Sequence, residues 1–166
     1  DKLENYVIRK QEKGYWCGPA TIQGVVERLR GYTLTQASLA NSLGTTQGSG
    51  TYVYKMKDYL NGIIPSNINT FVYEYIGSST SDSYVFNIIK SNINKYVPVI
   101  MHADTKTLYA YNGKSLGHYY TAIGYQIEDI PTSDGIKSLT YIHYVDSFYN
   151  DYGRGSVFGE NTDTLM

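Results

Sequence analysis

The stretch "QEKGYWCGPATIQGVVERLRG", from Gln11 to Gly31, holds the only cysteine of the chain and its clearest helical pattern. Proline favours an early helical position, as Pro19 would have here, and glycine suits the position just past a helix end. Between these signals, apolar residues recur at the three- and four-residue spacing of one helix face, namely Ile22, Val25, Val26 and Leu29. The spacing therefore predicts a helix with Cys17 at its N-terminal edge.

A single cysteine cannot form an internal disulfide. Cys17 must be an inert core residue, an intermolecular bridge, a lone metal ligand or a nucleophile. A helix N-terminus lowers the pKa of a thiol, because its amide N–H groups and the positive end of the helix dipole stabilise the thiolate. The position of Cys17 at such a helix end favours the nucleophile.

Length and charge limit the classes of partner. The chain has 166 residues, and we expect one domain over residues 1–166 that acts as a monomer. Its 14 Lys and Arg against 15 Asp and Glu give a formal charge of -1, and no run of like charges suggests nucleic acid as a partner. No apolar stretch approaches the roughly 20 residues that a membrane-spanning helix needs. A soluble protein is expected.

The composition suggests a location but does not fix it. The chain has 19 tyrosines and a charged fraction of only 17%, a style common in proteins exported by Gram-positive bacteria. We therefore expect an extracellular or cell-surface protein of such a bacterium, whose signal peptide was removed before Asp1.

Helical patterns dominate the first half of the chain and strand patterns the second. Further helices are predicted over 33–44, with Leu34, Ala37, Ala40 and Leu43 on one side, over 52–61, and over 81–96, with Val85, Ile88, Ile89 and Ile93 inward. One strand is predicted at 70–76 between these helices, and three more at 97–103, 118–128 and 139–148. Helices followed by antiparallel strands predict an α+β domain in two layers.

Of the three histidines, His118 is the best partner for the thiol. Gly117 before it lets a backbone or a substrate come close, and the alternating residues after it predict a strand, so His118 would lie at the mouth of that strand. His102 follows an apolar strand, and His143 lies three positions before Asp146 and so on the opposite face of a regular strand. We expect His143 to be structural or at the surface, and His102 to be partly buried or to line the cleft from a neighbouring strand.

An imidazole base needs an acceptor that holds its orientation. Asp146 ends the strand after that of His118, and neighbouring antiparallel strands could bring the two together, with Asp129 and Asp151 as weaker candidates. Gln11, six positions before Cys17, could place its amide beside the Cys17 N–H as the second donor of an oxyanion hole.

These residues resemble a known family. Gln11, the segment "CGPA" from Cys17, "GHYYTAIGYQ" from Gly117 and "YVDSF" from Tyr144 are similar to the papain-like cysteine peptidases, and among these to the double-glycine peptidases that process bacteriocin leaders. The resemblance covers nearly the whole chain. It implies a papain-like fold, with N-terminal helices, one of which carries the cysteine, packed against a C-terminal antiparallel sheet that carries the histidine and the aspartate.

The resemblance also implies roles for individual residues. Cys17 would be the nucleophile, His118 the general base and acid, Asp146 the orienting residue and Gln11 the oxyanion donor. Two positions depart from the family pattern. Trp16 replaces the acidic residue often found before the cysteine, and Ser147 replaces the proline that commonly follows the aspartate.

Other kinds of site are disfavoured. One cysteine and three histidines without paired short spacings do not suggest a zinc site, and the segment "GSG" at 48–50 lacks the spacing of a serine nucleophile elbow. The sequence therefore predicts a cysteine peptidase that needs no cofactor or metal and acts on a peptide or protein. An acyl-transferring enzyme and a non-catalytic peptide-binding protein of the same fold remain alternatives.

Overall fold

The computed structural model describes residues 2–76, 80–104, 117–148, 151–155 and 162–165. Three helices come first: α1 (Cys17–Arg30), α2 (Gln36–Leu43) and α3 (Val53–Ile63). The short strand β1 (Tyr73–Ile76) leads to the fourth helix, α4 (Asp82–Asn94). The remaining elements are β2 (Val99–Asp104), β3 (Gly117–Thr132), β4 (Gly135–Asp146), β5 (Asp151–Gly155) and β6 (Thr162–Leu165). The α+β class and the four predicted helices are confirmed.

The strands form one six-stranded sheet in the order β1-β6-β2-β3-β4-β5, and each recorded pair is antiparallel. The C-terminal strand β6 lies between β1 and β2, so the first and last strands of the chain are neighbours. The sequence analysis missed β5 and β6. Each has only four or five residues, which is too short for an alternating pattern to stand out.

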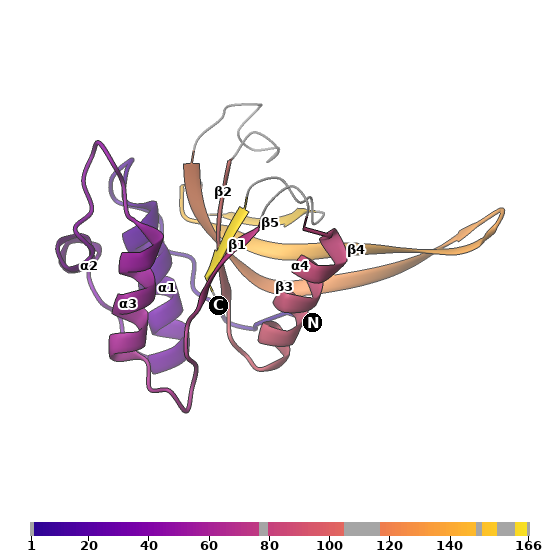
Figure 1. Cartoon of the computed structure of the whole chain (residues 1–166), viewed down its shortest axis with the longest axis horizontal. Coiled ribbons are helices and arrows are strands. Elements are labelled where there is room, and N and C mark those ends of the chain that lie inside the picture. The colour runs from indigo at the N-terminus through magenta and orange to yellow at the C-terminus, as the bar shows by residue number, and fades with distance from the viewer. Residues whose placement is uncertain (1, 77–79, 105–116, 149–150, 156–161, 166) are drawn as a thin grey trace.

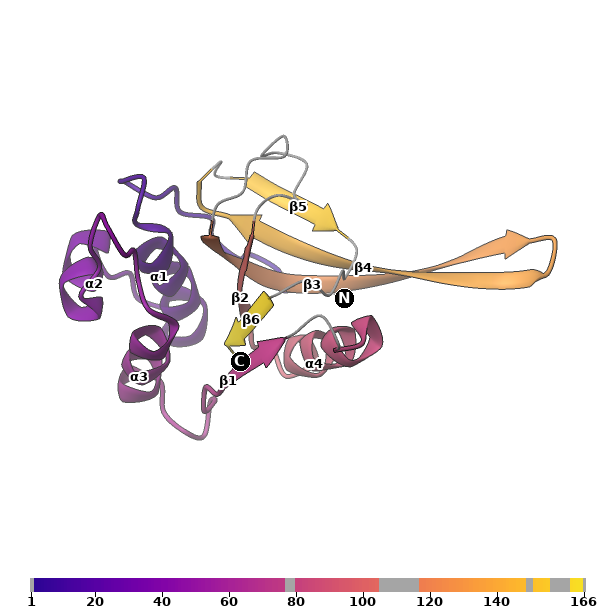
Figure 2. The same cartoon turned by 45° about the horizontal axis from the view of Figure 1, so that its top comes forward.

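The sheet carries helices on both faces, so the two-layer prediction is wrong in this respect (Figure 1). In β2, Ile100 belongs to the core formed with α1, α2 and α3, whereas Val99 and Met101 belong to the core formed with α4. Successive side chains of a strand point to opposite faces. Figure 2 shows α4 apart from the other three helices.

Helix ends follow local sequence signals. Gly31 and Gly44 adopt left-handed backbone conformations, with φ of 75° and 65°, directly after α1 and α2, where glycine avoids the steric penalty of a Cβ. Thr35 and Ser81 cap the N-termini of α2 and α4 by accepting a hydrogen bond from a backbone N–H. At α1, Trp16 occupies the capping position without a side-chain hydrogen bond, so the first N–H groups beside Cys17 have no side-chain cap.

The predicted inner faces of two helices need correction. In α2, Gln36 and Leu39 are buried and Ala37 is exposed, and in α4, Phe86 is buried whereas Ile88 is only partly so. The first difference arises because Gln36 satisfies its polar atoms inside the protein, so burial of a glutamine there carries no penalty.

Strands β3 and β4 form a long hairpin that extends beyond the rest of the sheet (Figures 1 and 2). Their pairing runs from Thr121 opposite Val145 out to Thr132 opposite Gly135, with one shift of register between Ala122 and Gly124. The base of this hairpin packs against α1 and α4, and its outer part is exposed to solvent. His118 and Asp146 both lie at the base, at the end of the hairpin furthest from its turn.

In the part of the chain that the structure describes, no helix has both the length and the apolar character needed to cross a membrane.

Substitution of Gly18 tests how closely α1 packs against the loop before α3. A Cβ at this position would lie 2.4 Å from Thr51 Oγ1 and 2.6 Å from Thr51 Cβ, so Thr51 must move. We expect Gly18→Ala to lower the free energy of unfolding by roughly 1–3 kcal/mol, measured by urea denaturation.

Gly62→Ala in α3 is the matched control. Nothing lies within 4 Å of a Cβ built on Gly62, so this change should be neutral or stabilise the protein by up to about 1 kcal/mol, as alanine does in a helix. Similar effects of the two substitutions would contradict the packing described for Gly18.

Candidate active site

Cys17 is the first residue of α1, and its side chain is partly buried. The thiol interacts with the imidazole of His118 and with the backbone N–H groups of Tyr119 and Gly18, and each of these interactions favours its ionised form. The sulfur therefore has an imidazole on one side and two fixed amide dipoles beside it, which is an environment for a thiolate.

His118 lies at the start of β3, directly after Gly117, and is only 5% exposed. Its Nε2 atom lies 2.8 Å from Oδ1 of Asp146. The imidazole is therefore held between a carboxylate and a thiol, which fixes both its orientation and the hydrogen-bonding role of each ring nitrogen.

Asp146 is the last residue of β4 and is only 4% exposed. Its Oδ1 atom also accepts a hydrogen bond from the backbone N–H of Phe148, at 2.9 Å. The pairing of Thr121 with Val145 brings the end of β4 beside the start of β3. The predicted route by which Asp146 reaches His118, across two neighbouring antiparallel strands, is the one that the structure has.

The charges of these groups reinforce one another. Burial alone would lower the pKa of His118, but the hydrogen bonds and charges of Asp146 and Cys17 outweigh burial and raise this pKa to about 9. Burial alone would raise the pKa of the Cys17 thiol, but the hydrogen bond and charge of His118, together with the Tyr119 and Gly18 N–H groups, lower it. Both shifts favour the pair in which the thiol is a thiolate and the imidazole an imidazolium.

Two contacts fix the distance between the start of α1 and the start of β3. The Tyr119 hydroxyl, one residue after His118, donates a buried hydrogen bond of 2.7 Å to the backbone oxygen of Thr51. The side chain of Thr51 packs directly against Gly18, one residue after Cys17. Sequence reasoning missed Tyr119 and Thr51, because the chain contains many tyrosines and threonines and neither of these two stands out.

Gln11 is 7% exposed, and its side chain makes three hydrogen bonds. Its amide nitrogen donates to the backbone oxygens of Lys13 and Gly14, both at 3.0 Å, and its Oε1 atom accepts from the Ser147 hydroxyl at 3.1 Å. Both amide hydrogens are thus engaged by the loop that leads to Cys17. The role of Gln11 as an oxyanion donor stays a prediction.

Of the remaining candidates, His102 lies next to Tyr119, whereas His143 and Asp129 lie further out on the hairpin. The ring of His102 stacks on that of Tyr119, with centroids 4.4 Å apart, and His143 pairs with Gly124 further along the hairpin. Asp129 accepts a hydrogen bond from Ser138 on the outer part of the hairpin. Asp151 pairs with Asp146 in the sheet, but its side chain lies outside the described part.

Trp16 is partly buried beside the site, and the Lys13 ammonium lies 4.8 Å from the centre of its indole ring. Tyr15 contacts the same ring edge to face. These contacts hold the loop before Cys17.

Among the described residues, no group of three His, Cys, Asp or Glu side chains is arranged to hold a metal ion.

This chain is similar to a known protein family and to a solved structure. Residues 3–156 match the protein family described as the Peptidase_C39 like family. The fold is similar to the crystal structure of the peptidase domain of Streptococcus ComA, a bifunctional ABC transporter involved in a quorum-sensing pathway, with a TM-score of 0.62 and 20% sequence identity. That alignment covers 97% of this chain and 98% of the ComA domain. No curated protein sequence matches significantly.

At 20% identity, the likeness to the ComA domain shows the fold. The family match shows the family as well as the fold, because it spans nearly all of the residues, including Cys17, His118 and Asp146. This chain belongs to the Peptidase_C39 like family of cysteine peptidases.

Proposed function

We propose that Cys17, His118 and Asp146 are the catalytic triad of this cysteine peptidase. The observation that carries the proposal is the buried imidazole of His118, which contacts the Cys17 thiol and lies 2.8 Å from the Asp146 carboxylate. Such an arrangement supplies a nucleophile that is already ionised and a proton donor beside it.

The reaction would run in two stages. The Cys17 thiolate attacks the carbonyl carbon of the peptide bond, and the His118 imidazolium gives its proton to the departing amine, which leaves a thioester. His118, now neutral, removes a proton from water as the water attacks the thioester. The product leaves as the carboxylic acid, which gives its proton to the solvent, and thiolate and imidazolium are restored. Throughout, Asp146 holds the ring and stabilises its positive charge.

We propose that the tetrahedral intermediates are stabilised by the backbone N–H of Cys17 and the side chain of Gln11. Cys17 opens α1, where the first N–H groups have no acceptor within the helix. Gln11 can contribute a hydrogen only if the oxyanion displaces the carbonyl of Lys13 or Gly14 from its amide nitrogen. Two such donors contribute more to the transition state than to the ground state.

The substrate would be a peptide or a protein. Action outside the cell and a monomeric state stay predictions from the sequence.

Loss of the nucleophile should abolish turnover. We expect Cys17→Ala and His118→Ala to lower kcat/KM on a peptide found in a library screen by at least about 10³-fold, as when a member of a catalytic unit is removed. Cleavage is followed by mass spectrometry, and denaturation curves check that the variants fold.

Undiminished cleavage by Cys17→Ala would contradict the proposal. If the folded wild type instead binds library peptides without cleaving any, the chain is a peptide-binding protein. If added amines appear in the products in place of water, it is an acyl-transferring enzyme.

The ion pair should appear in the pH dependence of Cys17 alkylation by iodoacetamide. In the wild type the reaction should stay fast below the ordinary thiol pKa of roughly 8.5, because His118 lowers the pKa of Cys17. In His118→Ala the imidazole no longer opposes burial and only the weaker effect of the Tyr119 and Gly18 N–H groups remains, so the midpoint should rise above that of the wild type.

The orienting role of Asp146 is tested by the pH dependence of peptide turnover in Asp146→Ala. Asp129→Ala, on the outer hairpin, is the control. Without the Asp146 charge, the pKa of His118 should fall by roughly 1–3 units from about 9, which shortens the pH range of peptide turnover at its basic end. A basic limit that does not move in Asp146→Ala, or one that moves equally in Asp129→Ala, would contradict the orienting role.

A further inference from the structure

Ser147 follows Asp146 at the end of β4, and its side chain faces Gln11. Both residues are only 7% exposed, and the Ser147 hydroxyl donates to Gln11 Oε1 at 3.1 Å. The backbone oxygen of Ser147 also accepts from the backbone N–H of Gln11 at 2.9 Å. One residue therefore holds both the main chain and the side chain of Gln11.

The orientation of the Gln11 carboxamide is determined by its neighbours. Carbonyl oxygens only accept hydrogen bonds, so the atom that lies 3.0 Å from both the Lys13 and the Gly14 oxygens must be the amide nitrogen. The carboxamide oxygen then faces Ser147, which donates to it. The nitrogen end faces the loop that leads to Cys17, and the oxygen end is anchored to β4.

The main chain around Gln11 is fixed independently by a second buried glutamine. Gln36, 3% exposed, donates to the backbone oxygen of Lys10 and accepts from the backbone N–H of Glu12, both at 2.9 Å. Its amide nitrogen also donates to Gln23 at 3.1 Å. Gln36 thus binds the backbone on each side of Gln11, so a change in the Ser147 hydroxyl should affect the side chain of Gln11 and leave its backbone in place.

We propose that Ser147 is a positioning residue, whose hydroxyl anchors the oxygen end of the Gln11 carboxamide while the nitrogen end donates a hydrogen to the reacting oxyanion. When an oxyanion displaces Lys13 or Gly14 as acceptor, the nitrogen end loses one of its two constraints. The bond from Ser147 then keeps the carboxamide from rotating away. This inference rests on the proposed function, and specifically on the oxyanion role of Gln11.

Two reactions of the Cys17 thiol distinguish an effect of Ser147 on Gln11 from an effect of Ser147 on Asp146. With 4-nitrophenyl acetate, the thiolate adds to the ester carbonyl through an oxyanion, 4-nitrophenolate leaves, and water then hydrolyses the acetyl thioester. With iodoacetamide, the thiolate displaces iodide at a saturated carbon, and no oxyanion forms. A residue that acts through Gln11 should affect the ester reaction alone, whereas one that acts through Asp146 should change both.

Ser147→Ala should lower kcat for the ester by roughly three- to tenfold, which is the effect of losing one buried hydrogen bond, and should leave the pH profile of alkylation unchanged. Gln11→Ala should cost about 10²-fold or more in the same reaction. In the double variant, the loss should equal that of Gln11→Ala alone, because Ser147 then has nothing to position.

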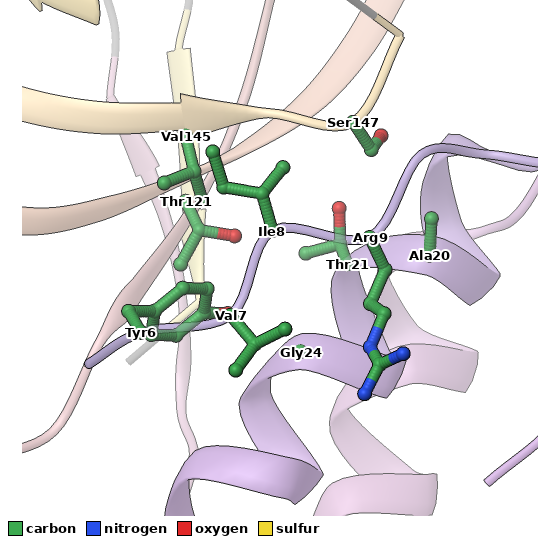
Figure 3. A pocket seen from close by; sticks show the side chains of 10 residues that line it. All are labelled: Tyr6, Val7, Ile8, Arg9, Ala20, Thr21, Gly24, Thr121, Val145 and Ser147. Carbon is green, nitrogen blue, oxygen red and sulfur yellow. The ribbon is translucent and has the colours of Figure 1, made fainter. Parts of the chain in front are cut away.

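Ser147→Thr is the rescue variant, since it keeps the hydroxyl. Ser147 lines a cavity of about 10 Å³ between β4 and α1, shown in Figure 3 with Ala20 and Thr21 on its α1 side. Threonine adds one methyl group to the side chain that borders this cavity. We expect Ser147→Thr to retain most of the ester turnover. The matched control is Ser138→Ala, which removes a serine hydroxyl that donates to Asp129 on the outer hairpin.

The proposal is overturned if Ser147→Ala lowers ester turnover equally with and without Gln11, if it shifts the alkylation profile, or if it has no effect on the ester. Failure of the proposed function gives a different result. In that case the wild type does not turn over the ester faster than Cys17→Ala does, whatever residue stands at position 147.

Discussion

The contact between the Cys17 thiol and the His118 imidazole joins the first residue of a helix to the first residues of a strand about a hundred positions later in the chain. His118 is buried and Cys17 is partly buried, and burial opposes the charge on each of them. The ion pair is stable because each charge lies next to the other, and because the Asp146 carboxylate lies 2.8 Å from the far side of the ring. Removal of any one of the three leaves a buried charge without its partner.

Much of the surrounding structure serves to hold these two chain segments at a fixed distance. Thr51 contacts Gly18 through its side chain and accepts from the Tyr119 hydroxyl through its backbone oxygen, so a single loop residue contacts both the helix of Cys17 and the strand of His118. On the other side, Ser147 joins the end of β4 to Gln11. The site is thus fixed by hydrogen bonds between loops and strand ends, while the two hydrophobic cores fix the helices and the sheet.

The sequence predicted those parts of the site that depend on local pattern. Cys17 followed from a helix with clear apolar spacing, and Asp146 from two consecutive strands that could pair with each other. It did not predict the burial of Gln36, because a glutamine on the inner face of a helix is satisfied only by distant backbone atoms. Nor could it place β6 between β1 and β2. That order depends on pairing between distant segments, which leaves no periodic signal in a strand of four residues.

The most direct test of the ion pair is the titration of the His118 ring, followed by NMR in the wild type and in Cys17→Ala. We predict that His118 in the wild type stays protonated through neutral pH and titrates at about pH 9. In Cys17→Ala its midpoint should lie lower, because the thiolate that helps to raise it is gone. A midpoint near the ordinary histidine value of roughly 6.5, equal in both proteins, would contradict the account.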